Sequence, residues 1–294
     1  MSDIPSIQWF PGHMAKTRRL MRENLSLVDL VVELRDARVP YSSQNPEIQK
    51  LVGNKPRLVV LNKSDMADPA VTRQWLGFYK GQKLPVMETD CRSGKGVKEF
   101  PKVVEQVLSD LFARRRAKGI KGKPVSVMVV GVPNVGKSSF INRMAGSRRT
   151  NVADRPGVTR GKQWVKINQE IDMLDMPGVL WPKFDDPKVG ERLAFTGAVK
   201  DDIVDIQLLA GRLLEFLAVQ YPAPLATRYK LDLPGESLAQ MDGPQLLELV
   251  GKKRGMMIAG GEVDLERAAV AVLDEFREGK IGRISLETPE VLAP

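Results

Sequence analysis

A glycine-rich segment near the middle of the chain constrains the fold more than any other feature. Residues 131–138 read G-V-P-N-V-G-K-S and match the pattern G-x-x-x-x-G-K-[ST]. The segment follows an apolar run at 125–130 that predicts a buried strand, and it precedes a helix expected to start near Ser139. Backbone amides in such a loop, together with the helix N-terminus, surround phosphate oxygens. The sequence therefore predicts a phosphate-binding loop in an α/β domain.

The polar residues of this loop have distinct expected roles. We expect Lys137 to place its charge beside the β- and γ-phosphates and to act in catalysis, and Ser138 to offer its hydroxyl to Mg²⁺. The other loop residues expected to bind the nucleotide are Asn134, Val135, Gly136 and Ser139.

Strand and helix signals alternate through the first part of the chain, which is typical of a mostly parallel sheet. After about Pro187 the strand signals stop, and apolar residues recur at helical spacing. We therefore expect an α/β domain over residues 1–185 and a smaller all-helical C-terminal domain over residues 186–294. Within the first domain we distinguish an N-terminal segment, 1–27, and a basic linker, 114–123.

Charge divides the chain in the same place. The net formal charge is +9, from 45 basic and 36 acidic residues. Residues 1–185 carry a net charge of +14, whereas residues 186–294 carry −5. This balance predicts a polyanionic partner. Because phosphate neutralisation needs Lys and Arg, we expect most nonspecific affinity for such a partner to come from the first domain.

A second motif, N-K-S-D at residues 62–65, follows the predicted strand that ends at Leu61. A fixed carboxylate such as Asp65 can accept hydrogen bonds from both the N1–H and the exocyclic amine of guanine. Adenine offers no such pair of donors on that edge. Together with a phosphate loop, Asn62, Lys63 and Asp65 therefore predict binding of a guanine nucleotide.

A third motif, D-M-P-G, occupies residues 175–178 after another short predicted strand. Asp175 can hold Mg²⁺ through water, and the Gly178 amide can meet a γ-phosphate oxygen that hydrolysis removes. In the polar stretch before this motif we expect Thr159 to bind Mg²⁺ and contribute to catalysis, with Thr150 as the alternative.

The order of these motifs is unusual, because the base-reading motif precedes the phosphate loop. This order indicates a circularly permuted domain, in which the basic stretch 114–123 joins the former ends without altering the sheet. The motif set, with Asp36-Ala37-Arg38-Val39-Pro40 and the opening Gln8-Trp9-Phe10-Pro11-Gly12-His13-Met14-Ala15-Lys16, closely resembles the ribosome biogenesis GTPase A family of circularly permuted P-loop GTPases. The resemblance covers essentially the whole chain.

This resemblance implies that the protein hydrolyses GTP to GDP and phosphate as a switch in late assembly of the large ribosomal subunit. Its partners would be a precursor of that subunit and its rRNA, contacted in part by the helical domain. The likeness also implies that Asn134 helps to hold K⁺. It further places Asp90 and Cys91 in the loop that backs the guanine, where Cys91 departs from the family's usual S-A-K-like sequence and is interpreted as a small packing residue.

The residue after D-M-P-G is Val179, which cannot orient an attacking water as glutamine does in many GTPases. The resemblance assigns that role to His13, the only histidine of the chain. The N-terminal segment leads into the predicted strand at 28–34 and is therefore expected to lie beside the switch. Arg155 and Arg160 could instead neutralise the developing charge.

Two other functions are left open by the residues. The protein could be a nucleotide-gated RNA-binding module in which hydrolysis is incidental, or, as a more distant alternative, a P-loop ATPase or nucleotide kinase.

No apolar run approaches the roughly 18 residues of a membrane span, and no signal peptide is recognisable. The only cysteine is Cys91, so no intrachain disulfide can form. We expect a cytoplasmic protein without a membrane span or a disulfide partner.

Overall fold

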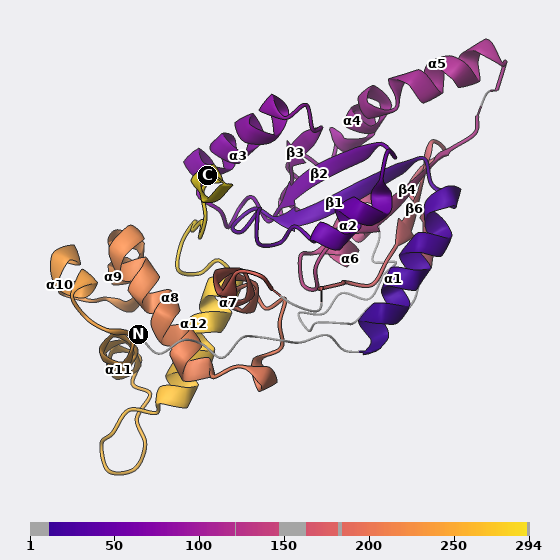
Figure 1. The fold of residues 1–294 in the computed structure, drawn as a ribbon. Coiled ribbons are helices and arrows are strands. Elements are labelled where there is room, and N and C mark those ends of the chain that lie inside the picture. Colours follow the sequence, from indigo (N-terminus) through magenta and orange to yellow (C-terminus); the bar gives the residue numbers. More distant parts are fainter. Residues whose placement is uncertain (1–11, 121, 147–162, 182–183, 293–294) are drawn as a thin grey trace. The chain divides into compact units, whose positions relative to one another are not determined.

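The computed structural model describes residues 12–120, 122–146, 163–181 and 184–292. The chain divides into two compact units, shown in Figure 1. The α/β unit joins Phe10–Pro182 to Ser285–Pro294, and the helical unit contains Lys183–Ile284. The division therefore differs from the expected one at the C-terminus, because the last ten residues belong with the sheet rather than with the helices.

A six-stranded sheet forms the centre of the α/β unit, in the order β3-β2-β1-β4-β6-β5. Neighbouring strands are parallel except for β5, which pairs antiparallel with β6. The prediction of a mostly parallel sheet is confirmed. The strands are β1 (Leu30–Asp36), β2 (Arg57–Asn62), β3 (Val86–Glu88), β4 (Val125–Val130), β5 (Gln163–Lys166) and β6 (Ile171–Asp175).

Helices cover both faces of this sheet, and every residue of β1 is buried. The helices are α1 (Gly12–Asn24), α2 (Pro46–Val52), α3 (Pro69–Gly81), α4 (Phe100–Val107), α5 (Ser109–Ala117) and α6 (Lys137–Met144). Two of them begin at a proline preceded by a polar cap: the side chains of Asn45 and Asp68 accept hydrogen bonds from the first backbone amides of α2 and α3. The expected basic linker is shorter than 114–123, because three of its arginines lie in the last turn of α5.

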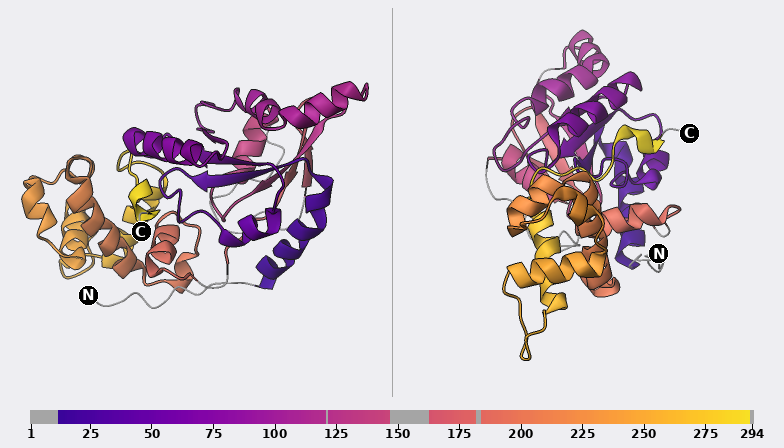
Figure 2. Two further views of the ribbon diagram at one scale, coloured as in Figure 1. Left: turned by 45° about the horizontal axis from the view of Figure 1, so that its top comes forward. Right: turned by 90° about the vertical axis from the view of Figure 1, so that its left-hand side faces the viewer.

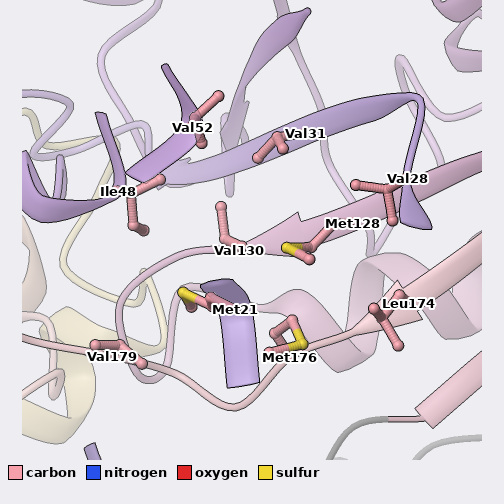
Figure 3. Close-up of a cluster of buried hydrophobic side chains, with 10 residues drawn as sticks. All are labelled: Met21, Val28, Val31, Ile48, Val52, Met128, Val130, Leu174, Met176 and Val179. Carbon is pink, nitrogen blue, oxygen red and sulfur yellow. The ribbon is translucent and has the colours of Figure 1, made fainter. Parts of the chain in front are cut away.

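A cluster of buried apolar side chains packs α1 and α2 against the sheet (Figure 3). Met21 of α1 is 2% exposed and shares this cluster with Met176 and Val179, which belong to the segment after β6. The helix α1, which lies within the N-terminal segment, is thus packed against the D-M-P-G segment. Members of the cluster are Met21, Val28, Val31, Ile48, Val52, Met128, Val130, Leu174, Met176 and Val179.

The helical unit packs around α8. Most of its helices are the orange and yellow ribbons in Figure 2. At the crossing of α8 and α11 two glycines meet: a Cβ on Gly211 would lie 3.1 Å from the Cα of Gly243. Within the described residues no helix is both long and apolar enough to cross a bilayer. The helices are α7 (Pro187–Phe195), α8 (Ile206–Gln220), α9 (Pro222–Tyr229), α10 (Gly235–Ala239), α11 (Gly243–Lys253) and α12 (Leu265–Arg277), with short 3₁₀ turns at Asp201–Ile203 here and at Leu25–Leu27 and Pro289–Leu292 in the α/β unit.

Candidate functional site

Polar residues gather where four neighbouring parallel strands end. Asp36 at the end of β1 is the register partner of Asn62 at the end of β2, and Asp175 at the end of β6 pairs with Val129 of β4. The phosphate loop begins at Gly131, directly after β4. In open parallel sheets, ligands bind at this carboxyl edge. The sheet therefore brings all three sequence motifs to one place although the chain orders them unusually.

The phosphate loop curls around its own lysine. Gly136 has a φ of 93°, and a Cβ there would lie 2.5 Å from the side-chain nitrogen Nδ2 of Asn62, so this position favours glycine. The Nζ of Lys137 donates to the carbonyl oxygens of Gly131 (3.2 Å) and Val132 (3.0 Å). Burial lowers the pKa of Lys137 to about 8, against the attraction of Asp175. The ammonium group is thus held inside the loop at the place where phosphates bind in such loops.

Asp175 has a buried carboxylate without a hydrogen-bond partner among the described residues. Its side chain is buried, and neither carboxylate oxygen meets a donor among the described residues. Burial raises the pKa of Asp175 to about 6, although Lys137 opposes the shift. A buried carboxylate without donors is suited to a cation or its water ligands. The chemistry of this carboxylate fits Mg²⁺, for which the hydroxyl of Ser138 would be a further ligand from the loop.

No group of three His, Cys, Asp or Glu side chains gathers as a metal cage in the described part of the chain. Mg²⁺ is commonly held by one or two carboxylates together with substrate phosphates and waters.

The D-M-P-G segment touches the phosphate loop. A Cβ on Gly178 would lie 2.7 Å from the Cα of Pro133 and 3.1 Å from the Nζ of Lys137, so a side chain at this position would clash. The next residue, Val179, donates its amide to the carbonyl of Gly131 at 3.2 Å and is only 1% exposed. Its buried apolar side chain cannot position a water.

The base-reading motif is bonded directly to the phosphate loop. The side-chain amide of Asn62 donates to the carbonyl of Val135 at 2.9 Å, across 73 residues of sequence. The Nζ of Lys63 donates to the carbonyl of Asn134 at 2.6 Å. These two bonds join the ends of β2 and β4 into one site that can hold the base and the phosphates of a single nucleotide.

Asp65 presents a partly exposed carboxylate at the base-reading end. Its side chain is 23% exposed, and Arg92 approaches it at 3.8 Å. Burial, and then repulsion from Asp90, raise the pKa of Asp65. A carboxylate that is oriented but not fully engaged by the protein can accept the two donors of guanine.

The loop after β3 supports this end of the site. The carboxylate of Asp90 accepts hydrogen bonds from the backbone amides of Arg92 (2.7 Å) and Ser93 (3.2 Å), so it shapes the turn. The thiol of Cys91 donates to the Oδ1 of Asn62 at 3.2 Å. Burial and the charge of Asp90 raise the pKa of Cys91 to about 12, so the thiol stays protonated and acts as a hydrogen-bond donor rather than a nucleophile.

Four expected residues lie outside the described residues: Thr159, Thr150, Arg155 and Arg160. His13 lies in the first turn of α1, but its side chain also lies outside the described residues. The roles expected for these residues stay predictions. The helix that carries His13 is nevertheless anchored by Met21 in the same cluster as Met176 and Val179.

Sequence reasoning assigned no role to Asp36 and Arg38. Asp36 forms an ion pair with Lys63 at 3.3 Å and accepts a forked pair of bonds from the guanidinium of Arg38. Although burial opposes it, the charges of Arg38 and Lys63 hold the pKa of Asp36 well below its usual range. The available signal was an acid directly after a buried parallel strand, next to the strand that carries the base-reading motif.

Comparisons with known proteins agree with this geometry. A family model described as 50S ribosome-binding GTPase matches residues 126–210. Ribosome biogenesis GTPase A from Priestia megaterium is 47% identical over 286 residues, covering 97% of each chain. The GDP-bound structure of YlqF from Thermotoga maritima superposes with a TM-score of 0.66 at 28% identity, covering 92% of this chain and 100% of that one. Its GNP-bound counterpart gives 0.65, covering 94% and 99%. The identity and coverage show that the chain belongs to the ribosome biogenesis GTPase A family.

Proposed function

We propose that this GTPase binds GTP with Mg²⁺, and K⁺ at Asn134, and hydrolyses it in the cytoplasm as a switch in late assembly of the large ribosomal subunit. The observation that carries the proposal is the direct bonding of Asn62 and Lys63 to the phosphate loop, which makes one guanine-nucleotide site from two distant motifs. The printed names of the relatives, which refer to ribosome biogenesis and 50S binding, support the choice of partner.

The chain's own residues account for binding and charge stabilisation. Lys137 is held where it can neutralise charge that develops between the β- and γ-phosphates, and the backbone amides of the loop orient the phosphate oxygens. Asp175 and Ser138, with Thr159, would hold Mg²⁺, which when bound supplies further positive charge at these oxygens. Gly178 lies next to the loop, and its amide would report whether a γ-phosphate is present.

The attacking water needs a residue other than Val179 to orient it, because that side chain is apolar and buried. We propose His13 for this role. Packing of Met21 beside Met176 and Val179 fixes α1 against the D-M-P-G segment, which supports a position for the helix start near the γ-phosphate. An imidazole can accept a hydrogen bond from water at neutral pH.

Base preference tests the nucleotide assignment. Replacing Asp65 by Asn (D65N) removes the acceptor for two guanine donors, so GTP affinity should fall and xanthosine triphosphate affinity should rise. Competition titrations against a fluorescent nucleotide measure both affinities. Asp172→Asn, on β6, changes the same side-chain type outside the motifs and serves as the matched control. An unchanged base preference in D65N would contradict guanine reading.

Sedimentation with ribosomal particles tests the biological role. We expect the protein to travel with large-subunit precursors in GTP and to be released in GDP. His13→Ala should abolish the stimulation of hydrolysis by these particles while nucleotide affinity persists. Equal stimulation in the variant would remove the role proposed for His13, and binding that is GTP-dependent but never coupled to hydrolysis would favour a nucleotide-gated RNA-binding module.

A further inference from the structure

The last described residues of the chain are built into the α/β unit. We call residues 285–292 the C-terminal strap and residues 36–45 the D-A-R loop. Ser285, Leu286 and Glu287 are each less than 5% exposed, although they directly follow the helical unit in sequence. The 3₁₀ turn Pro289–Leu292 contacts α3 (Figure 1).

Glu287 is the main anchor of the strap. Its carboxylate accepts hydrogen bonds from the backbone amides of Tyr41 and Ser42, the latter at 2.9 Å, and from the Ser42 hydroxyl at 2.7 Å. Its carbonyl accepts a bond from the Nε1 of Trp75 at 3.0 Å. Beside it, the Ser285 hydroxyl accepts from the Asp68 amide at 3.1 Å. One acid, 3% exposed, thus ties the end of the chain to the D-A-R loop and to α3.

The D-A-R loop continues this connection to the nucleotide motifs. The amide of Leu286 donates to the carbonyl of Arg38 at 2.9 Å. The guanidinium of Arg38 in turn donates two hydrogen bonds to the carboxylate of Asp36, at 2.9 and 2.8 Å. Asp36 pairs with Lys63 at 3.3 Å, and Lys63 bonds to the carbonyl of Asn134 in the phosphate loop. The path from strap to phosphate loop therefore runs through short polar contacts between buried or half-buried residues.

The same loop also reaches the D-M-P-G segment. The side-chain amide of Asn45 donates to the carbonyl of Val179 at 3.1 Å while its oxygen caps α2. The D-A-R loop is thus bonded to the base-reading motif at one end and to the segment after Gly178 at the other. The strap is hydrogen-bonded to the loop between these two attachments.

We propose that Glu287 is a positioning residue for the nucleotide site, which acts through the D-A-R loop and Asp36 to hold Lys63 against the phosphate loop. The proposal rests on the proposed function only in that a guanine nucleotide occupies this site. The helical unit is joined by the chain to the D-M-P-G segment at its start and to the strap at its end. Displacing the strap should therefore weaken nucleotide retention. Because the helical unit is covalently joined to the strap, it can influence nucleotide release through this connection.

The test measures dissociation of a fluorescent GDP analogue from the full chain in stopped flow. Glu287→Ala should raise the dissociation rate about fivefold or more, because interaction losses are expressed mainly in off-rates. Glu287→Gln keeps an oxygen for the two amides and a polar group for Ser42, so it should restore a rate near that of wild type. Ser42→Ala removes only the hydroxyl that donates to Glu287 and should give an intermediate dissociation rate. This variant keeps the proposal testable if Glu287→Ala does not fold.

Two controls separate positioning from loss of stability. Val104→Ala removes buried methyl groups from α4 of the same unit and should lower the unfolding temperature without changing the dissociation rate. Asp36→Asn should raise the rate, and combining it with Glu287→Ala should add little, because residues in one contact chain are not additive. Multiplicative effects of the two variants, or a wild-type rate in Glu287→Ala, would overturn the proposal. No GDP binding by the wild-type chain would instead refute the proposed function.

Discussion

At the scale of single residues, burial moves the pKa values of the two charged groups at the phosphate loop toward each other. Lys137 falls to about 8 and Asp175 rises to about 6, because each charge is taken out of water and the two attract only partly enough to compensate. Burial therefore disfavours the charged form of both groups. A bound triphosphate beside Lys137 and a cation beside Asp175 would supply the missing counter-charges. The site gains affinity for its ligands at the cost of stability without them.

Removing the charge of Asp175 should stabilise the protein in the absence of metal. A carboxyl with a raised pKa binds protons more tightly when folded, so stability is lost as pH rises from about 4 to about 6. Above that window Asp175→Asn should raise the free energy of unfolding by about 3 kcal/mol, since the pKa rises from 3.8 to about 6 and each pKa unit corresponds to about 1.4 kcal/mol. Urea unfolding at pH 8 in chelator, and again at pH 4, measures this; a larger gain at pH 4 would contradict the assignment.

Cys91 should resist alkylation. Its raised pKa leaves very little thiolate at pH 8, and the thiolate is the reactive form. We expect iodoacetamide to modify Cys91 in the folded protein much more slowly than in urea, as followed by mass spectrometry. Cys91→Ser keeps a donor toward Asn62 and should bind GDP as wild type does, whereas Cys91→Val should bind it more weakly. Rapid labelling of the native thiol would contradict its hydrogen-bonded, protonated state.

At the scale of elements, the sequence predicted what depends on local pattern. The strands β1, β2 and β4 and the three nucleotide motifs are continuous in sequence, so apolar runs and glycine spacing were sufficient to predict them. The role of Asp36 was missed, because it belongs to no local motif and depends on the strand pairing that joins β1 to β2. The strap was assigned to the helical domain, because its anchor on Ser42 joins residues 245 apart and leaves no local pattern.

Strand β1 also carries a buried charge network that periodicity alone would exclude. Glu33 and Arg35 are both fully buried and pair at 3.0 Å, and Arg35 donates further bonds to Tyr79 and Gln44, each at 2.8 Å. Arg57 approaches Glu33 at 3.6 Å. The network links the centre of the sheet to α3 and to the D-A-R loop.

Arg35→Leu should be strongly destabilising because it leaves Glu33 with less compensation in the core. We expect a loss of about 3–5 kcal/mol, and a smaller loss in the double variant Glu33→Gln/Arg35→Leu, in which no carboxylate remains unpaired. Arg19→Ala breaks an exposed ion pair with Glu23 and should cost under about 1 kcal/mol. Denaturant unfolding of the three variants measures the order. Equal losses in the single and double variants would contradict an ionic role for the pair.

At the scale of the whole molecule, the charge difference between the two parts of the chain predicts that electrostatic attraction to a polyanion comes mainly from the α/β unit. The basic cluster of the helical unit is already paired: Lys252 with Glu248, Lys253 with Asp232 and Arg254 with Glu275. These cations are less available for phosphates. On α5, Arg115 bonds to Asp29 at 3.1 Å, whereas Arg114 and Arg116 are exposed.

The salt dependence of RNA binding should therefore follow α5 rather than α11. Each phosphate contact releases counterions, so its loss lowers the slope of log K against log salt by about one. We expect Arg114→Ala/Arg116→Ala to weaken binding of an rRNA fragment to the full chain and to flatten the slope. Lys252→Ala/Lys253→Ala, an equal change of charge, should alter it less, because Glu248 and Asp232 already neutralise these two lysines. Filter binding over a range of potassium chloride measures both slopes. A larger change for the α11 pair would place the main phosphate contacts in the helical unit and overturn this division of roles.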